Sequence, residues 1–229
     1  MKRIVFILLI AFASFQSISA QTNESGRRFE IGCFASAGFQ ILDLEELNNR
    51  FVEYGYASFS EEAIAYAGGI YFGNRDYIFT SLGIYSFSDA KSNNTFTETK
   101  LTAFGLNFDV NYTILKTEKL FLYPMAGISA NVISIMINDK SGTGQSFNNS
   151  IEVLNGERVI YTNPLLLFNF GIAMNRIILR SRNDLGIGLQ LGYRIDFSET
   201  QWGVSGFEVS DGPNIKAGGF YANLVLNLF

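Results

Sequence analysis

Residues 101–114 read LTAFGLNFDVNYTI, and this stretch decides the fold. Bulky apolar side chains occupy every second position, and the positions between them are small or polar. A period of two is typical of a β-strand with one apolar face, because successive side chains point to opposite sides. The apolar face holds Phe104, Leu106, Phe108, Val110, Tyr112 and Ile114, and the opposite face holds Ala103, Gly105, Asn107, Asp109, Asn111 and Thr113.

Seven further segments carry the same alternation. Residues 185–197 repeat it most clearly, with leucine and isoleucine on one face and glycine, Gln190 and Arg194 on the other. Each segment has about the length that a tilted strand needs to cross a bilayer. The remaining strands are predicted at residues 29–39, 63–72, 77–87, 120–132, 166–174 and 220–228.

The connections between these strands alternate in length. Residues 73–76 and 116–119 form short turns, and 175–183 is intermediate. Long polar connections are predicted at 41–61, 88–99, 137–163 and 198–215. Short turns at one end and long loops at the other are typical of outer-membrane barrels, in which the short turns are periplasmic. An even strand number then places both termini of the barrel in the periplasm. The short turns are also mostly basic, and the long loops are mostly acidic.

The N-terminus predicts export. Lys2 and Arg3 precede an apolar run at 4–15, and small residues ending at Ala20 follow it. This order is typical of a secretory signal peptide, and the run is short for a membrane anchor. We therefore expect a signal peptide at 1–20, a periplasmic extension at 21–28 and a barrel at 29–229.

The chemistry of the two strand faces distinguishes a membrane barrel from a soluble one. A water-exposed face would carry many lysines and glutamates, but the small face carries mainly Gly, Ala, Asn and Ser. Such residues suit the interior of a barrel of about eight strands. The bulky face is nearly free of charge, as lipid contact requires, since each charged group there costs about 2–4 kcal/mol. Cys33 lies on this bulky face and is expected to be inert. A helical span at 120–137 is the alternative, but Pro124 and Gly127 argue against it.

The whole pattern resembles the eight-stranded outer-membrane barrels of the OmpA/OmpX type. The resemblance covers the export signal, the amphipathic strands, the loop lengths and a last strand ending at Phe229. It implies an outer-membrane location, contact with outer-membrane lipid and lipopolysaccharide, and assembly by the outer-membrane insertion machinery, which reads a terminal aromatic residue. One departure is clear: the face of Phe229 also carries Asn223 and Asn227. The last strand therefore either contains a bulge or carries an atypical signal.

The composition excludes several kinds of chemistry. The chain has no histidine, so no Ser–His or Asp–His catalytic pair can form. One cysteine cannot hold a structural zinc ion. The net charge of −4 argues against a nucleic-acid-binding protein, which would need a basic surface. We therefore expect a protein that is not an enzyme and that needs no cofactor or metal.

Charged residues on the small face predict a polar network in the lumen. An unpaired charge there is costly, so Arg194 is expected to pair with Asp109 or Asp196. The network is interpreted as a hydrogen-bonded core that fills the barrel interior, and a selective pore lining is the alternative. Its members are Glu30, Asp109, Arg194, Asp196, Asn107 and Gln190.

Loop 41–61 is predicted to contain a short helix. Asp43 is a candidate N-cap, and Glu46 occupies the capping-box position. The helix can either contact a partner or close the barrel mouth as a lid. The side chains proposed for surface contact are Leu44, Leu47, Phe51, Tyr54 and Tyr56.

The predicted function follows from these features together. We expect a non-enzymatic outer-membrane barrel whose long loops contact an extracellular protein or another surface partner. The alternative is a small pore or a barrel that transports an apolar ligand. Loops on a rigid scaffold are the usual carriers of such functions.

Overall fold

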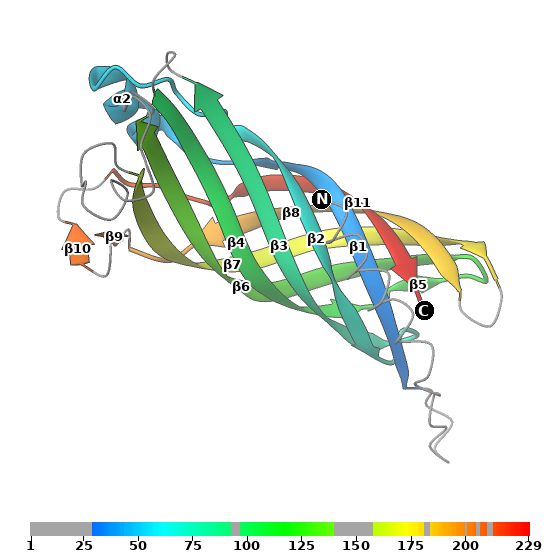
Figure 1. Cartoon of the computed structure of the whole chain (residues 1–229). Helices are drawn as coiled ribbons and strands as arrows, with labels where there is room; N and C mark the ends of the chain where they lie inside the picture. Colours follow the sequence, from blue (N-terminus) through cyan, green and yellow to red (C-terminus); the bar gives the residue numbers. More distant parts are fainter. Residues whose placement is uncertain are drawn as a thin grey trace, which may run out of the picture.

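Eight long antiparallel strands form a closed barrel in the computed structural model of the protein (Figure 1). The strands pair in the order β1, β2, β3, β4, β6, β7, β8, β11, and β11 pairs back onto β1. The predicted barrel and its strand number are therefore confirmed. The long strands are β1 (Glu30–Ile41), β2 (Glu62–Gly73), β3 (Ile78–Ser92), β4 (Thr97–Tyr112), β6 (Leu120–Asp139), β7 (Arg158–Leu179), β8 (Leu185–Asp196) and β11 (Gly219–Leu228).

Four shorter elements complete the fold: α2 (Glu45–Glu53), β5 (Leu115–Lys116), β9 (Trp202–Val204) and β10 (Phe207–Val209). Helix α2, β9 and β10 lie at one end of the barrel, which we call the loop end (Figure 1). The C-terminus, β5 and the short connections lie at the opposite end, which we call the turn end. The structure describes residues 29–92, 97–139, 158–180, 184–199, 201–204, 207–209 and 213–229. The predicted signal peptide and extension at 1–28 lie outside these ranges.

Two of the predicted long loops are partly strand. Strand β3 continues to Ser92 and β4 begins at Thr97, within the loop expected at 88–99. Strands β6 and β7 likewise extend far into the loop expected at 137–163. The apolar alternation stops before the pairing does, because the exterior residues here carry hydroxyl groups. They form a row across four neighbouring strands: Ser88, Thr102, Ser134 and Thr162.

The exterior of the barrel is an apolar belt. On β4, Phe104, Leu106 and Phe108 are exposed, whereas the residues between them face inward. Cys33 is half-buried on the same exterior face of β1, as predicted. The expected sidedness is therefore confirmed: bulky apolar groups cover the outside, and small and polar groups line much of the inside. Within the described ranges, no helix is long and apolar enough to cross a membrane.

Glycines on the inner face make room for amide side chains from the neighbouring strand. Gly105 lies opposite Asn131, and Gly188 lies opposite Asn175. A Cβ at either glycine would lie 1.6 Å from the Oδ1 of the opposing asparagine. A larger residue at either glycine would therefore force the opposing amide side chain to move.

The lumen contains three layers. The turn end is filled by an aromatic cluster that we call the plug, and the loop end is filled by an aliphatic cluster that we call the loop-end cluster. A polar layer lies between them. The plug consists of Tyr71, Phe79, Phe121, Tyr123, Met125, Ala173 and Ile177, with Phe34 and Phe229 against it. The main members of the loop-end cluster are Leu42, Leu44, Leu47, Phe59, Phe87, Leu101, Ile133, Ile135, Leu165, Leu167, Trp202 and Ile215.

The last strand contains no bulge. Strand β11 pairs continuously with β1 and with β8, without a shift in register. Phe229 therefore keeps the inward face of Asn227, and its ring stacks on Tyr71 with centroids 5.5 Å apart. Of the two alternatives offered for this strand, the bulge is wrong.

Candidate functional site

Helix α2 forms where the sequence predicts it, but it begins differently. Its N-cap is Leu44, and no side-chain hydrogen bond caps it. The backbone of Asp43 is instead paired with Lys216, with N–O distances of 3.1 and 3.3 Å. The predicted capping box is therefore wrong, because this bridge holds Asp43 outside the helix.

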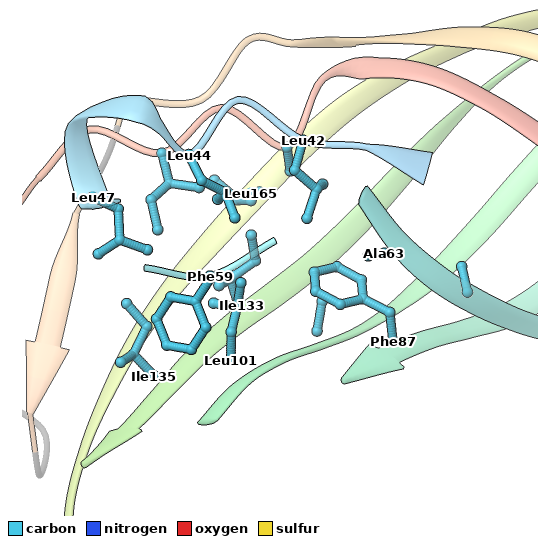
Figure 2. Close-up of a cluster of buried hydrophobic side chains, with 14 of the residues drawn as sticks. Leu42, Leu44, Leu47, Phe59, Ala63, Phe87, Leu101, Ile133, Ile135 and Leu165 are labelled. Atoms are coloured by element: carbon cyan, nitrogen blue, oxygen red, sulfur yellow. The ribbon is translucent and has the colours of Figure 1, made fainter. Parts of the chain in front are cut away.

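The helix closes the loop end as a lid. Leu44 and Leu47 are fully buried in the loop-end cluster, and Phe51 is half-buried against it. Figure 2 shows Leu44 and Leu47 near Phe59, Ile133 and Ile135, inside the barrel mouth. The lid alternative is thus the one that the structure adopts.

The proposed surface contacts need correction on this basis. Leu44, Leu47 and Phe51 are not available at the surface, because they anchor the lid. Tyr56 is half-buried, with its ring centroid 5.5 Å from that of Phe51. Of the five proposed contact residues, Tyr54 alone is well exposed, at 76%.

Paired hydrogen bonds hold the lid segment together. Asn48 Nδ2 donates to the carbonyl of Phe59 at 3.0 Å, and the amide of Phe59 donates to Asn48 Oδ1 at 2.8 Å. The amide of Ser60 then donates to Asp89 on β3 at 3.0 Å. A second loop completes the cover through Trp202, whose indole N–H donates to the carbonyl of Pro213 at 2.7 Å.

The polar layer is organised around Arg194. Its Nη1 donates to Gln40 Oε1 at 2.6 Å, and the Tyr85 hydroxyl donates to the same oxygen at 2.9 Å. The guanidinium carbon also lies 4.5 Å from the ring centroid of Tyr85 and 4.9 Å from that of Tyr221. Cation–π contacts of this kind stabilise a desolvated arginine.

The predicted ion pair of Arg194 is wrong. Among the described residues, no ion pair joins Arg194 to Asp109 or Asp196. Both carboxylates have other partners: Asp196 accepts from the amide of Ala217 at 3.1 Å, and Asp109 accepts from Asn169 Nδ2 at 3.3 Å. An amide and two aromatic rings therefore take the place of the expected carboxylate.

A small cavity of about 30 Å³ lies in the polar layer. It has room for about two water molecules, since one needs roughly 10–15 Å³. Four of the six predicted network residues line it: Asp109, Arg194, Asn107 and Gln190.

The fifth predicted network residue, Glu30, lies at the turn end. There it pairs with Arg75 at 3.2 Å, and Arg75 also pairs with Asp184 at 3.4 Å. The Arg75 guanidinium carbon lies 4.2 Å from the ring centroid of Phe229 and 4.9 Å from that of Phe121. We call Arg75 with its partners Glu30 and Asp184 the turn-end clamp. The sequence offers no signal for it, because Arg75 belongs to a short turn, where a basic residue is usually solvated.

Comparisons with known proteins extend only to fold. No protein family and no curated protein matches this sequence. The solved structures that resemble it include Ail of Yersinia pestis, crystallised with the heparin analogue sucrose octasulfate, at 9% identity, covering 88% of this chain and 97% of Ail, with a TM-score of 0.45. Neisserial surface protein A has 13% identity, covers 87% and 94%, and has a TM-score of 0.43. A major outer-membrane protein of Thermus thermophilus has 13% identity, covers 87% and 98%, and has a TM-score of 0.46.

These similarities are too distant to carry an argument about activity. The barrel architecture rests on the chain's own strand pairing. Across the described part of the chain, no group of three or more histidine, cysteine, aspartate or glutamate side chains is placed to hold a metal ion.

Proposed function

We propose that this protein is a non-enzymatic outer-membrane barrel that anchors a rigid contact surface outside the cell. In this arrangement the turn end, with the barrel termini, faces the periplasm and the loop end faces the exterior. The apolar belt supports the membrane anchor, because open or charged strand surfaces are unstable in hydrocarbon.

The filled lumen disfavours the narrow-pore alternative. Buried side chains occupy both ends, with Tyr123 in the plug and Leu44 and Leu47 in the lid. A water-filled path would require both clusters to open. A barrel of this size is normally filled by its own side chains.

The proposal rests on two exposed apolar side chains on the outer side of the lid. Val52 is 61% exposed and Tyr54 is 76% exposed, on either side of Glu53 at the end of α2. They are held in place from below by the buried Leu44 and Leu47. An exposed aromatic residue on a rigid support is a typical anchor for a protein partner. The segment 42–62 carries six acidic residues and one basic residue, Arg50, which pairs with Glu46, so we expect a basic partner. The acidic residues are Asp43, Glu45, Glu46, Glu53, Glu61 and Glu62.

Photo-crosslinking in intact cells tests this function. A benzophenone amino acid replaces Tyr54 at the lid tip in one variant and Phe104 on the apolar belt in a control. Both positions are exposed, but only the first is expected to face a partner. We expect position 54 to capture a discrete protein or surface polymer and position 104 to capture only lipid. If position 54 captures nothing beyond what position 104 captures, the contact surface is refuted.

A further inference from the structure

The polar layer contains a cation that lacks an anionic partner in the described structure. Arg194 is 5% exposed, and its Nε has no hydrogen-bond acceptor. The cavity of about 30 Å³ lies directly beside it. A buried guanidinium is costly unless its charge is matched, and Gln40 supplies only a neutral oxygen.

The packed loop-end cluster lies immediately on the loop-end side of this arginine, and we call the space that its lid side chains occupy within the barrel the chamber. Tyr85 marks the boundary: its ring belongs to the loop-end cluster, and its hydroxyl joins Gln40 in the polar layer. The barrel wall of the chamber is mainly apolar, with Leu101, Ile133 and Leu167 fully buried in it, and it also contains the buried polar side chains of Thr99 and Asn163. Arg194 and Gln40 thus form the floor of a mainly apolar chamber.

The filling of the chamber comes largely from the lid. Leu44, Leu47 and Phe59 belong to the segment between β1 and β2 rather than to the barrel wall. The paired bonds between Asn48 and Phe59 hold this segment as one unit. Backbone contacts of Asp43 and Ser60 fasten its two ends. Binding of a ligand in the chamber therefore requires this unit to leave the loop-end cluster, and none of the strand-to-strand pairing of the barrel passes through it.

We infer that the chamber is a binding site for a single-chain aliphatic carboxylate. The carboxylate head lies against Arg194, Gln40 and Tyr85, and the aliphatic chain replaces the lid side chains. Arginine binds carboxylates through strong paired hydrogen bonds, and the chamber offers the apolar surroundings that the chain prefers. Asp109 faces the same cavity from β4, and Asp196 bonds to the amide of Ala217 beside Gln40, so the head must compete with both carboxylates for Arg194. The chain would displace Leu44 and Leu47, which support the contact surface proposed above, so ligand binding is expected to release that surface from the barrel mouth.

The chain's single tryptophan allows a direct test. Trp202 belongs to the loop-end cluster and is buried there. The full-length mature protein in lipid nanodiscs is titrated with 11-bromoundecanoic acid, whose bromine quenches tryptophan at short range. We expect saturable quenching of Trp202. Nonsaturable quenching, or none, overturns the proposal.

Two comparisons test the role of Arg194. In wild type, 11-bromoundecanol has the same chain without the carboxylate, and we expect it to bind about tenfold more weakly. Arg194→Met should weaken the acid by a similar factor, and Arg194→Lys should restore part of the affinity. Equal affinity of acid and alcohol overturns the assigned head-group site even if the variants do not fold.

A lipid-facing reporter controls for partition into the bilayer. In a Trp202→Phe, Phe104→Trp variant, the acid and the alcohol should both quench without saturation, because Phe104 is exposed on the apolar belt. If Trp202 in wild type behaves like this reporter, the quenching comes from the bilayer and the site is refuted.

Discussion

The two ends of the lumen are both filled with apolar side chains, but they are built from different parts of the chain. The plug at the turn end comes mainly from the strands themselves, through residues such as Tyr71, Phe79 and Tyr123. The loop-end cluster depends on side chains from connecting segments, including Leu44, Leu47 and Trp202. The plug is therefore tied to the barrel register, whereas the lid is added to a barrel that is already closed.

We therefore expect the plug to determine the stability of the whole barrel and the lid side chains to determine only the local stability of the lid. Loss of a plug residue leaves a cavity among strands that pair with one another, so the whole barrel is weakened. Loss of a lid residue loosens a unit that is held by its own packed side chains and by contacts at its two ends, outside the strand pairing of the barrel. Four substitutions, in order of expected effect on the barrel, test this distinction.

The largest loss is expected for Tyr123→Ala in the plug. Tyr123 is 1% exposed, its hydroxyl accepts from Asn175 at 2.6 Å, and its ring centroid lies 5.0 Å from that of Phe79. Removing a buried aromatic side chain costs about 3–5 kcal/mol. Urea unfolding in lipid vesicles, followed by gel mobility without boiling, measures the loss. The exterior Tyr112→Ala is the control, and a loss as large there would contradict the assignment.

An intermediate loss is expected for Arg75→Met in the turn-end clamp. The substitution removes two ion pairs and the contacts with Phe121 and Phe229. It also leaves Glu30 and Asp184 without their cation, so we expect a loss of about 2 kcal/mol in the same assay. Lys116→Met breaks only an exposed pair with Asp76 and should cost less than about 0.5 kcal/mol. Similar values for the two variants would show that the clamp adds nothing.

A local effect is expected for Leu47→Ala in the lid. Leu47 is fully buried, so the lid should lose about 2–3 kcal/mol of its local stability. The gel-mobility transition of the barrel should move little. The emission of Trp202, which is 3% exposed, should shift to longer wavelength as water enters. A barrel as destabilised as that of Tyr123→Ala would mean that the lid and the barrel unfold together.

The smallest effect is expected for Tyr54→Ser at the lid tip. This side chain is exposed, and such substitutions usually change stability by less than about 0.5 kcal/mol. Both the barrel transition and the Trp202 emission should remain unchanged, while capture of a partner by a benzophenone at position 52 should fall. A shift in Trp202 emission would instead place Tyr54 in the packing of the lid.

The strands and their sidedness could be predicted because alternation reports which face a side chain occupies. Phe104 and Leu106 are outside and Asn107 and Asp109 are inside, as their parity indicates. Alternation does not report depth along the barrel. The inward aromatic residues of the plug, such as Tyr71 and Tyr123, therefore did not stand out from the small residues of the same face.

The partners of individual charges could not be predicted either. The choice of Gln40 over a carboxylate for Arg194 depends on how β1, β3 and β8 meet across the lumen. The pairing of Glu30 depends on how the turn after β2 places Arg75 beside the first residue of β1. Similarly, the bridge between Asp43 and Lys216 joins two loops that are far apart in sequence, and it overrides the local capping pattern.

The opposed glycines and asparagines of the inner wall also constrain how this sequence can change over generations. A methyl group at position 105 or 188 would force the amide of Asn131 or Asn175 to move, and it would lie 2.9 Å from a backbone oxygen of the neighbouring strand. An alanine at either position is therefore expected to cost less once a smaller residue has replaced the asparagine. Among descendants of this gene, each glycine should covary with its cross-strand amide.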